Sequence, residues 1–275
     1  MEDRIVDPPP EPPHDSYSDR SQVSHLWYEV RLCLGFLTRI PVFTVEYSKH
    51  SSLAAASWAF PVVGVVIGLV GMIVLWLTEM FGLAAQLSAL LAIAFMTILT
   101  GALHENGLAK TADGFGVTGD ADQRLSVMND RQLGVFGGVA LVVIFCGRWL
   151  ALGDLVAISF SDGIAAMIAA AAISRGVLPF VMHAAPDTNT EGLNFAADRP
   201  EARPAWIALA IAAAVGLFAF GFAGTILVLL VAAIVTFVIV KMAQKSFGGV
   251  NADVLGAIQL LAEIAVLVTA ASLAA

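Results

Sequence analysis

Residues 60–80 read FPVVGVVIGLVGMIVLWLTEM, a stretch whose single charged residue, Glu79, stands next to its end. About 20 consecutive apolar residues cross the hydrocarbon core of a bilayer when they form an α-helix. Because an unpaired polar group in hydrocarbon costs several kcal/mol, a single segment is stable there only as a helix. The stretch therefore predicts a transmembrane helix over Phe60–Met80.

Further apolar runs of similar length follow along the chain. With 59% hydrophobic residues, 13% charged residues and a mean hydropathy of +0.84, they predict an all-α polytopic integral membrane protein of about seven transmembrane helices. The other predicted spans are Leu83–Leu103, Leu133–Leu155, Ile164–His183, Ala205–Phe222, Thr225–Val240 and Leu255–Ala274. The shorter piece Leu32–Phe43 contains Arg39 and Pro41, and it predicts an interfacial or re-entrant segment.

The N-terminal residues differ in kind from the rest. Prolines at positions 8–10, 12 and 13 alternate with acids, a composition that predicts a disordered tail over residues 1–30. Residues 31–275 are then a single membrane-embedded domain. The net charge of −8 gives no reason to expect nucleic-acid binding.

The basic residues predict the orientation in the membrane. With seven spans, all of the 14 Lys and Arg residues lie on one side except Arg148 and Arg175, which fall inside spans. By the positive-inside rule this side is cytoplasmic, which predicts a bacterial cytoplasmic (inner) membrane protein with its site facing the cytoplasm. Arg148 is expected to pair with Asp154 or Asp162, whereas Arg175 is open to a structural or a phosphate-binding interpretation.

Residues 101–116 read GALHENGLAKTADGFG, and we interpret them as a polar loop between the second and third spans. The carboxylate oxygens of such a loop suit a hard cation such as Mg²⁺, although the side chains of an acidic loop are also commonly just solvated. The oxygen-rich residues here and downstream are His104, Glu105, Asp113, Asp120, Asp122 and Asp130.

Five segments resemble, in this order, those of the cobalamin synthase family. They are Phe36–Val42, Phe60–Gly64, His104–Gly116, Arg124–Gly138 and Gly248–Ala257. The pairing of His-x-x-Gly-Leu-Ala-x-Thr-Ala-Asp-Gly with a downstream Met-x-Asp-x-x-x-Gly, here Met128–Gly134, is the specific part. The resemblance extends from about Val30 to the C-terminus.

The resemblance implies an adenosylcobinamide-GDP ribazoletransferase. Such an enzyme transfers the cobinamide-phosphate part of adenosylcobinamide-GDP to α-ribazole or its 5′-phosphate, releases GMP, and uses Mg²⁺. The expected partners are these substrates, the lipid bilayer and other cobamide-assembly enzymes.

Residue roles follow from the same resemblance and from the chemistry of the side chains. Catalytic roles are expected for His104, Asp113 and Asp130, substrate contacts for Arg39, Lys110, Arg131, Arg175 and Asn251, and metal ligation for Glu105, Asn106, Asp113, Asp130 and Asp253.

The chain departs from the family pattern His-x-Asp-Gly-x-x-Asp-x-x-Asp at two acids, which are Asn106 and Lys110 here. Asn251-Ala252 also replaces a common Thr-Gly. Either Lys110 contacts a phosphate directly, or the site is impaired and the protein serves as a membrane assembly factor.

A transporter is a third hypothesis, disfavoured because no inverted repeat is evident. A lipid-headgroup phosphotransferase is disfavoured because Asp-Gly-x-x-Ala-Arg is not found.

Overall fold

The computed structural model describes residues 15–42, 52–130, 132–188 and 199–274, which form an all-helical protein apart from one isolated β-bridge between Asp187 and Val250. The all-α prediction is confirmed. The helices are α1 (Asp15–Leu37), α2 (Leu53–Ala56), the 3-10 helix η1 (Ser57–Ala59), α3 (Phe60–Met80), α4 (Ala85–Thr100), α5 (Leu103–Gly116), α6 (Ala121–Asn129), α7 (Val135–Ile158), α8 (Phe160–Gly176), α9 (Leu178–Ala184), α10 (Ala202–Phe247) and α11 (Ala252–Ala274).

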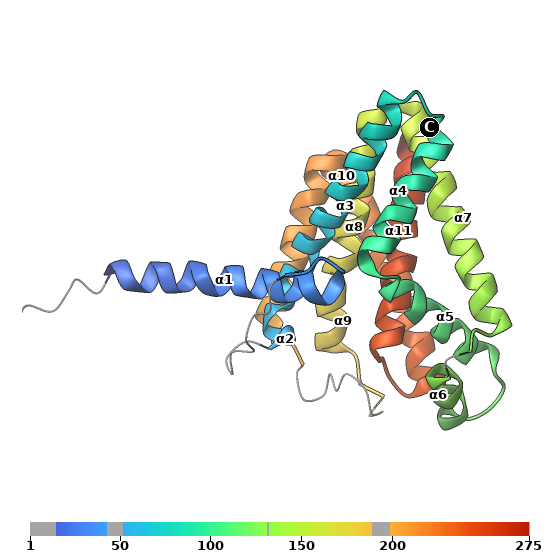
Figure 1. The fold of residues 1–275 in the computed structure, drawn as a ribbon. Coiled ribbons are helices and arrows are strands. Elements are labelled where there is room, and N and C mark those ends of the chain that lie inside the picture. The colour runs from blue at the N-terminus through green and yellow to red at the C-terminus, as the bar shows by residue number, and fades with distance from the viewer. Residues whose placement is uncertain (1–14, 43–51, 131, 189–198, 275) are drawn as a thin grey trace, which may run out of the picture.

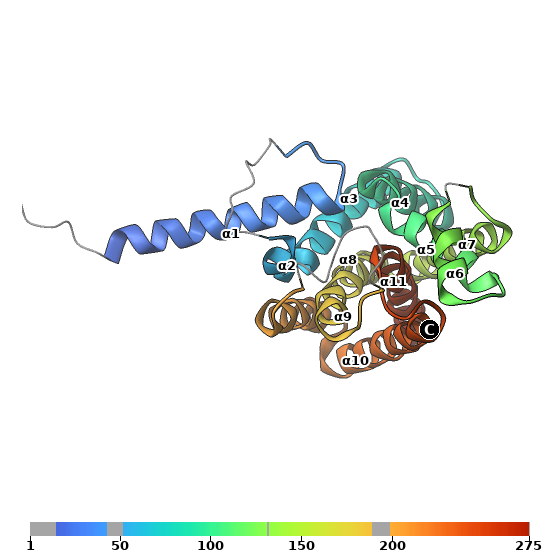
Figure 2. The same cartoon turned by 90° about the horizontal axis from the view of Figure 1, so that it is seen from below.

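The long helices run side by side between two ends of a bundle (Figure 1). The C-terminus lies at one end, and α5, α6 and α9 lie at the other. Seen along the bundle, α8 and α11 lie between the remaining long helices (Figure 2), and they are also the most fully buried spans.

Small residues allow α3 to approach α8 closely. A Cβ added to Gly64 would lie 2.7 Å from Cα of Ala172, and one added to Gly68 would lie 2.7 Å from Cα of Ile168. The small-xxx-small spacing of this pair therefore serves helix packing. The pair Gly134 and Gly138 does not, because the nearest atom to a Cβ on Gly138 is 4.0 Å away.

By length and composition, five helices of the described residues could cross a membrane, or six when the bent pair α4–α5 counts as one span. In this count α10 is a single helix of 46 residues, although at 1.5 Å per residue a straight helix of that length would measure about 69 Å, twice the bilayer core. It is interrupted at Gly221, where φ is 64° and ψ is −174°.

The chain reverses at Gly221, so that the two ends of α10 meet. Arg199, just before α10, donates a hydrogen bond to the carbonyl of Ala185 at 2.6 Å, and the amide of Val250, just after it, donates to Pro186 at 2.8 Å. The helix is thus two antiparallel arms, residues 202–220 and 222–247. Counting the second arm separately gives the predicted number of about seven spans.

The interpretation of residues 101–116 as a loop was wrong. Two consecutive left-handed residues, Gly101 (φ 65°) and Ala102 (φ 54°), end α4 and turn the chain by 89° into α5. The α5 helix forms because one of its faces packs against α11: a Cβ on Gly107 would lie 2.6 Å from the carbonyl oxygen of Asp253.

Helix α1 lies across the bundle rather than along it (Figure 1). It begins at Asp15, within the segment predicted to be a disordered tail; residues 1–14 lie outside the described part. The Glu29 carboxylate accepts a hydrogen bond from Trp58 Nε1 at 2.7 Å, which fastens α1 to η1. Burial, together with the charge of Glu29, raises the pKa of the Cys33 thiol, which donates to the carbonyl of Ala56.

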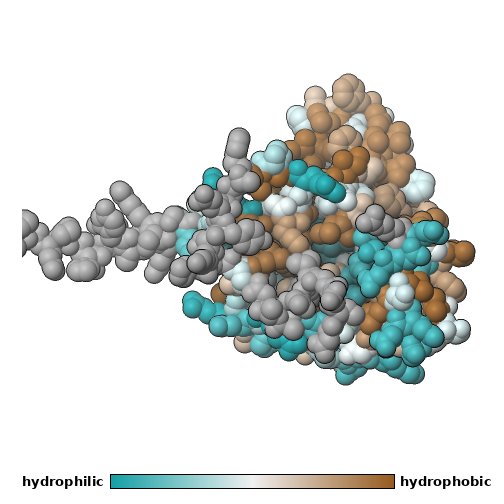
Figure 3. Space-filling view, turned by 60° about the horizontal axis from the view of Figure 1, so that its bottom comes forward, coloured by the Kyte–Doolittle hydropathy of each residue, from teal (hydrophilic) through white to brown (hydrophobic). Residues whose placement is uncertain are grey.

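Hydrophilic residues gather at the end of the bundle that carries α5, α6 and α9 (Figure 3). Beyond this end the surface is mainly hydrophobic, as expected for the part in contact with lipid. The polar end is therefore the part of the bundle suited to contact with water.

Gly221→Ala tests the hairpin. A Cβ is strained at this combination of φ and ψ, which costs about 1–3 kcal/mol, so we expect a lower unfolding temperature in detergent. Gly138→Ala is the matched control, because Gly138 lies inside a helix with open space around it. Equal unfolding temperatures for Gly221→Ala and the wild-type protein would contradict the strained reversal.

Candidate functional site

Helix α5 carries the polar residues of the site on two different faces. Asn106, Ala109, Lys110 and Asp113 line one cavity of ≈ 310 Å³, which the segment after α6 closes with Asp130, Gln132 and Leu133. These α5 positions are spaced by three or four residues, as residues on one helix face are. His104 and Glu105 are not part of this lining.

Asp113 joins α5 to the N-terminus of α7. It is 8% exposed, and its two carboxylate oxygens accept hydrogen bonds from the amides of Gly134 and Gly137, each at 2.8 Å. A Cβ on either glycine would collide with the carboxylate, so a larger residue at either position would force the Asp113 side chain to move. A negative charge is favourable at a helix N-terminus, so Asp113 has a structural role as well as its place in the cavity.

Lys110 bridges α5 and α11. Its Nζ lies 3.6 Å from Oδ2 of Asp253, and both side chains are partly exposed. Two kinds of group at this cavity could bind a phosphate: the amides at the N-terminus of α7 and the ammonium group of Lys110. The amides of Gly134 and Gly137 already bond to Asp113, which leaves Lys110 as the group of the described cavity lining that can meet a phosphate.

Asp130 is exposed at the end of α6, where its carboxylate accepts a hydrogen bond from the amide of Gln132 at 3.1 Å. Its neighbour Arg131, a predicted substrate contact, lies outside the described residues. The cavity thus brings together four of the predicted site residues, Asn106, Lys110, Asp113 and Asp130.

Glu105 points away from the cavity into a buried ion network. Arg148 on α7 lies 3.2 Å from Glu105 and 2.6 Å from Glu263 on α11. Arg175 on α8 lies 3.5 Å from the second oxygen of Glu263 and donates to the carbonyl of Ala171 at 3.0 Å. The expected partners of Arg148 were wrong, since Asp154 instead accepts a hydrogen bond from Gln86.

Gln259 completes this network. Its amide donates to Glu263 at 2.6 Å and to Ser174 at 2.9 Å, so that α8 and α11 are joined by neutral as well as charged groups. All of these side chains are buried, and Arg175 is 2% exposed. The geometry therefore favours the structural interpretation of Arg175 over contact with a phosphate.

His104 lies between this network and the polar end of the bundle. It is 3% exposed, and its Nε2 has no hydrogen-bond partner among the described residues. It borders both the small network cavity and a second cavity that also contains Asn106 and Asp253. His104 and Asp113 were predicted to act together, but the structure places them at different cavities.

The predicted metal ligands do not form a single cage. Glu105 is paired with Arg148, whereas Asp253 is paired with Lys110. Within the described ranges, no three His, Cys, Asp or Glu side chains come together in a way that could hold a metal ion. Mg²⁺ usually needs only one or two carboxylates when substrate phosphates supply other ligands, and Asp113 with Asp130 meets that smaller requirement.

The remaining predicted contacts lie at helix ends. Arg39 is exposed, and its side chain packs on Gly101 at the corner between α4 and α5. The side-chain oxygen of Asn251 accepts a hydrogen bond from the amide of Val254 at 3.0 Å and so caps α11.

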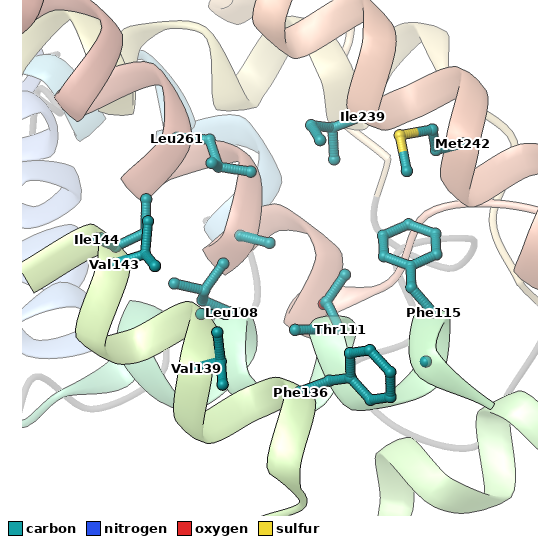
Figure 4. Close-up of a pocket in the computed structure, with 14 residues that line it drawn as sticks. Leu108, Thr111, Phe115, Phe136, Val139, Val143, Ile144, Ile239, Met242 and Leu261 are labelled. Atoms are coloured by element: carbon teal, nitrogen blue, oxygen red, sulfur yellow. The ribbon is translucent and has the colours of Figure 1, made fainter. Parts of the chain in front are cut away.

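An apolar pocket of ≈ 440 Å³ lies on another face of α5 (Figure 4). Phe115 of α5, Phe136 of α7 and Met242 of α10 surround it at one end, and Leu261 of α11 lies at the other. None of the described residues that line this pocket is ionisable, so it differs in kind from the polar cavity beside Asp113.

Sequence reasoning missed Glu263 and Gln259. Glu263 is the only charged residue of the predicted span Leu255–Ala274. A lone acid at membrane depth requires a partner, and the two intramembrane arginines were available. This was the signal that could have identified the network.

These features define a helical membrane protein with a polar, carboxylate- and lysine-lined cavity at one end of its bundle. Its sequence matches the cobalamin-5-phosphate synthase family over residues 29–271, so the chain belongs to this family. No solved structure matches the chain.

Similar proteins carry one name. The chain is 38% identical over 242 residues to an adenosylcobinamide-GDP ribazoletransferase of Mesorhizobium japonicum, covering 88% of this chain and 92% of the relative. It is 33% identical over 244 residues to the protein of that name from Bradyrhizobium diazoefficiens, covering 89% and 93%. A third, from Sinorhizobium medicae, is 34% identical over 256 residues, covering 90% and 97%.

Arg148→Met tests the buried network. Removal of Arg148 leaves Glu105 without a counterion, and breaking a buried pair in this way costs about 3–5 kcal/mol. We expect a large fall in the unfolding temperature, partly restored in the double variant Arg148→Met, Glu105→Gln. If the double variant is no more stable than the single one, lost packing rather than uncompensated charge is the cause.

Proposed function

We propose that this protein is an adenosylcobinamide-GDP ribazoletransferase. The observation that carries the proposal is the cavity in which Asn106, Lys110, Asp113 and Asp130 meet, in a chain that aligns with relatives of that name over nearly its whole length. A ribose hydroxyl of α-ribazole, or of its 5′-phosphate, attacks the cobinamide-bearing phosphorus. A new P–O bond forms, the P–O bond to GMP breaks, and GMP leaves.

Lys110 binds a non-bridging oxygen of the pyrophosphate in this proposal. Its pairing with Asp253 holds the ammonium group at the edge of the cavity, where its charge offsets that of the phosphate. Such positioning and charge neutralisation supply most of the catalysis in phosphoryl transfer.

Asp130 accepts the proton of the attacking hydroxyl. It is the exposed carboxylate of the cavity lining, whereas both oxygens of Asp113 accept amide hydrogen bonds. This assignment replaces the one expected for His104, which is buried beside the ion network.

Mg²⁺ is part of the proposal. Asp113, Asp130 and the amide oxygen of Asn106 would hold it against the pyrophosphate, where it neutralises charge on the phosphate oxygens. The other predicted ligands, Glu105 and Asp253, have protein counterions instead.

The proposed orientation places the polar end of the bundle in the cytoplasm. The basic residues described at this end include the partly buried Arg124 of α6 and the exposed Arg199 and Lys241, so the positive-inside rule supports it. An inner-membrane location with a cytoplasmic active face is the consequence.

The assay measures GMP release by the protein in nanodiscs supplied with adenosylcobinamide-GDP and α-ribazole. We expect release that depends on Mg²⁺ and on the acceptor. Asp130→Asn should lower turnover by about 10²–10⁴-fold, as loss of a general base does. The matched control is Asp122→Asn, an exposed carboxylate of α6 outside the cavity. Equal loss in both variants would remove the assignment of Asp130, and no release from folded wild-type protein would overturn the proposed activity.

Lys110→Ala separates a direct phosphate contact from an impaired site. Because a hydrogen bond to a charged group contributes about 1.5–3 kcal/mol, we expect the KM for the GDP-activated donor to rise about 10–100-fold. The KM for α-ribazole should stay unchanged. The double variant Asn106→Asp, Lys110→Asp restores the family acids; a gain in its turnover would favour the impaired-site interpretation and the assembly-factor hypothesis.

A further inference from the structure

A groove of ≈ 540 Å³ lies between α9 and the two arms of α10, away from the proposed active site. Val177 and Val181 line one wall, and Leu209 of the first arm and Ala233 of the second line the others. The positions on the second arm run from Ala233 to Gln244, about 16 Å at 1.5 Å per residue. The groove is therefore elongated along the bundle, as an acyl chain in a bilayer leaflet is.

One end of the groove carries a cation. Lys241 lies about 9 Å before the end of α10 at Phe247, at 1.5 Å per residue. Its Nζ is 3.3 Å from Oε1 of Gln244 and 5.5 Å from the centre of the Phe237 ring. No carboxylate of the described residues forms an ion pair with it. A lysine at this depth extends its ammonium group toward the lipid headgroups.

A buried hydroxyl faces the groove below this cation. Thr236 is 9% exposed, lines the groove, and has no hydrogen-bond partner for Oγ1 among the described residues. In the same protein, the hydroxyls of Thr225 and Thr269 donate to the carbonyl four residues earlier, as is usual for threonine within a helix. Thr236 is therefore left with a donor that an occupant of the groove can satisfy.

An aromatic pair that includes Trp206 of the first arm of α10 lies at about the same membrane depth as Lys241 on the second arm. Trp206, four residues into α10, stacks edge-on against Phe180 of α9, with ring centres 5.4 Å apart. Tryptophan is typical of the boundary between headgroups and acyl chains. Since both ends of α10 meet residues 185–187, Trp206 and Lys241 lie at similar distances from the cytoplasmic end.

We infer that this groove binds one anionic glycerophospholipid. Its phosphate pairs with Lys241, an ester carbonyl accepts the hydrogen bond of Thr236, and an acyl chain lies between Val181 and Ala233. Thr236 precedes Lys241 by five residues, which is about 7.5 Å along the helix. Thr236 therefore lies deeper in the membrane than Lys241, as an ester carbonyl lies deeper than the phosphate of the same lipid. The described residues that line the apolar pocket of Figure 4 include no cation, so that pocket offers no such selectivity. Basic pockets between membrane helices are known to hold anionic headgroups.

The test is native mass spectrometry of the full chain released from nanodiscs of phosphatidylglycerol and phosphatidylcholine with identical acyl chains. We expect one phosphatidylglycerol to be retained in preference to phosphatidylcholine. Lys241→Ala should reduce this preference about fivefold, the contribution of one cation beside an anionic surface. Lys245→Ala, one turn further on and outside the groove lining, should leave it unchanged.

Two further variants separate the groove from general surface charge. Thr236→Val should weaken the retention of both lipids, whereas Thr269→Val, whose hydroxyl bonds within its own helix, should not. Ala233→Phe should fill the groove and expel the lipid, with Ala210→Phe on the first arm as control. Equal retention of both lipids by the wild-type protein, equal effects of Lys241→Ala and Lys245→Ala, or lipid retained by folded Ala233→Phe would overturn the inference. The lipid count does not depend on transferase activity.

Discussion

The buried network around Arg148 is the constraint on which the arrangement of the site depends. The two arginines at membrane depth pair with two carboxylates, and one of these, Glu263, lies within the span formed by α11. The second carboxylate, Glu105, reaches Arg148 only because α4 stops at Gly101 and α5 turns into the bundle. That turn also sets the next positions of α5, from Asn106 to Asp113, at the polar end of the bundle. The site is therefore positioned from within the hydrophobic core.

The transmembrane helices could be predicted because burial in lipid leaves a strong compositional signal. Even the division of α10 was visible, since the boundary between the predicted spans Ala205–Phe222 and Thr225–Val240 falls within a few residues of the reversal at Gly221. Helix α5 left no such signal: it is short and polar, and isolated helices of its length are marginal in water. Its stability comes from tertiary packing, above all the close approach of Gly107 to Gly256 of α11, which the local sequence does not reveal.

The interpretation of α5 as a loop also explains which site residues were grouped wrongly. In a loop, His104, Glu105 and Asp113 can all point to one place, but in a helix their directions are fixed by 3.6 residues per turn. Asn106, Lys110 and Asp113 then share a face, and His104 and Glu105 are directed into the bundle. The residue types indicated that polar side chains gather here. Which of them share a cavity could be predicted only with the knowledge that α5 is a helix. Glu263 was overlooked because a single acidic residue within an apolar segment does not form part of a recognisable sequence motif.

The substitutions at Asn106 and Lys110 change how the charges at the site are balanced. With the family acids at both positions, the group formed with Asp113, Asp130 and Asp253 would carry five negative charges, and the side chain at position 110 would face Asp253. In this chain Lys110 meets Asp253 directly, and the group carries a net charge of −2, from three aspartates and one lysine. A single divalent cation offsets that charge, whereas five carboxylates would require more. In the proposed mechanism this internal ammonium group supplies part of the neutralisation, at the edge of the cavity where the pyrophosphate is proposed to lie.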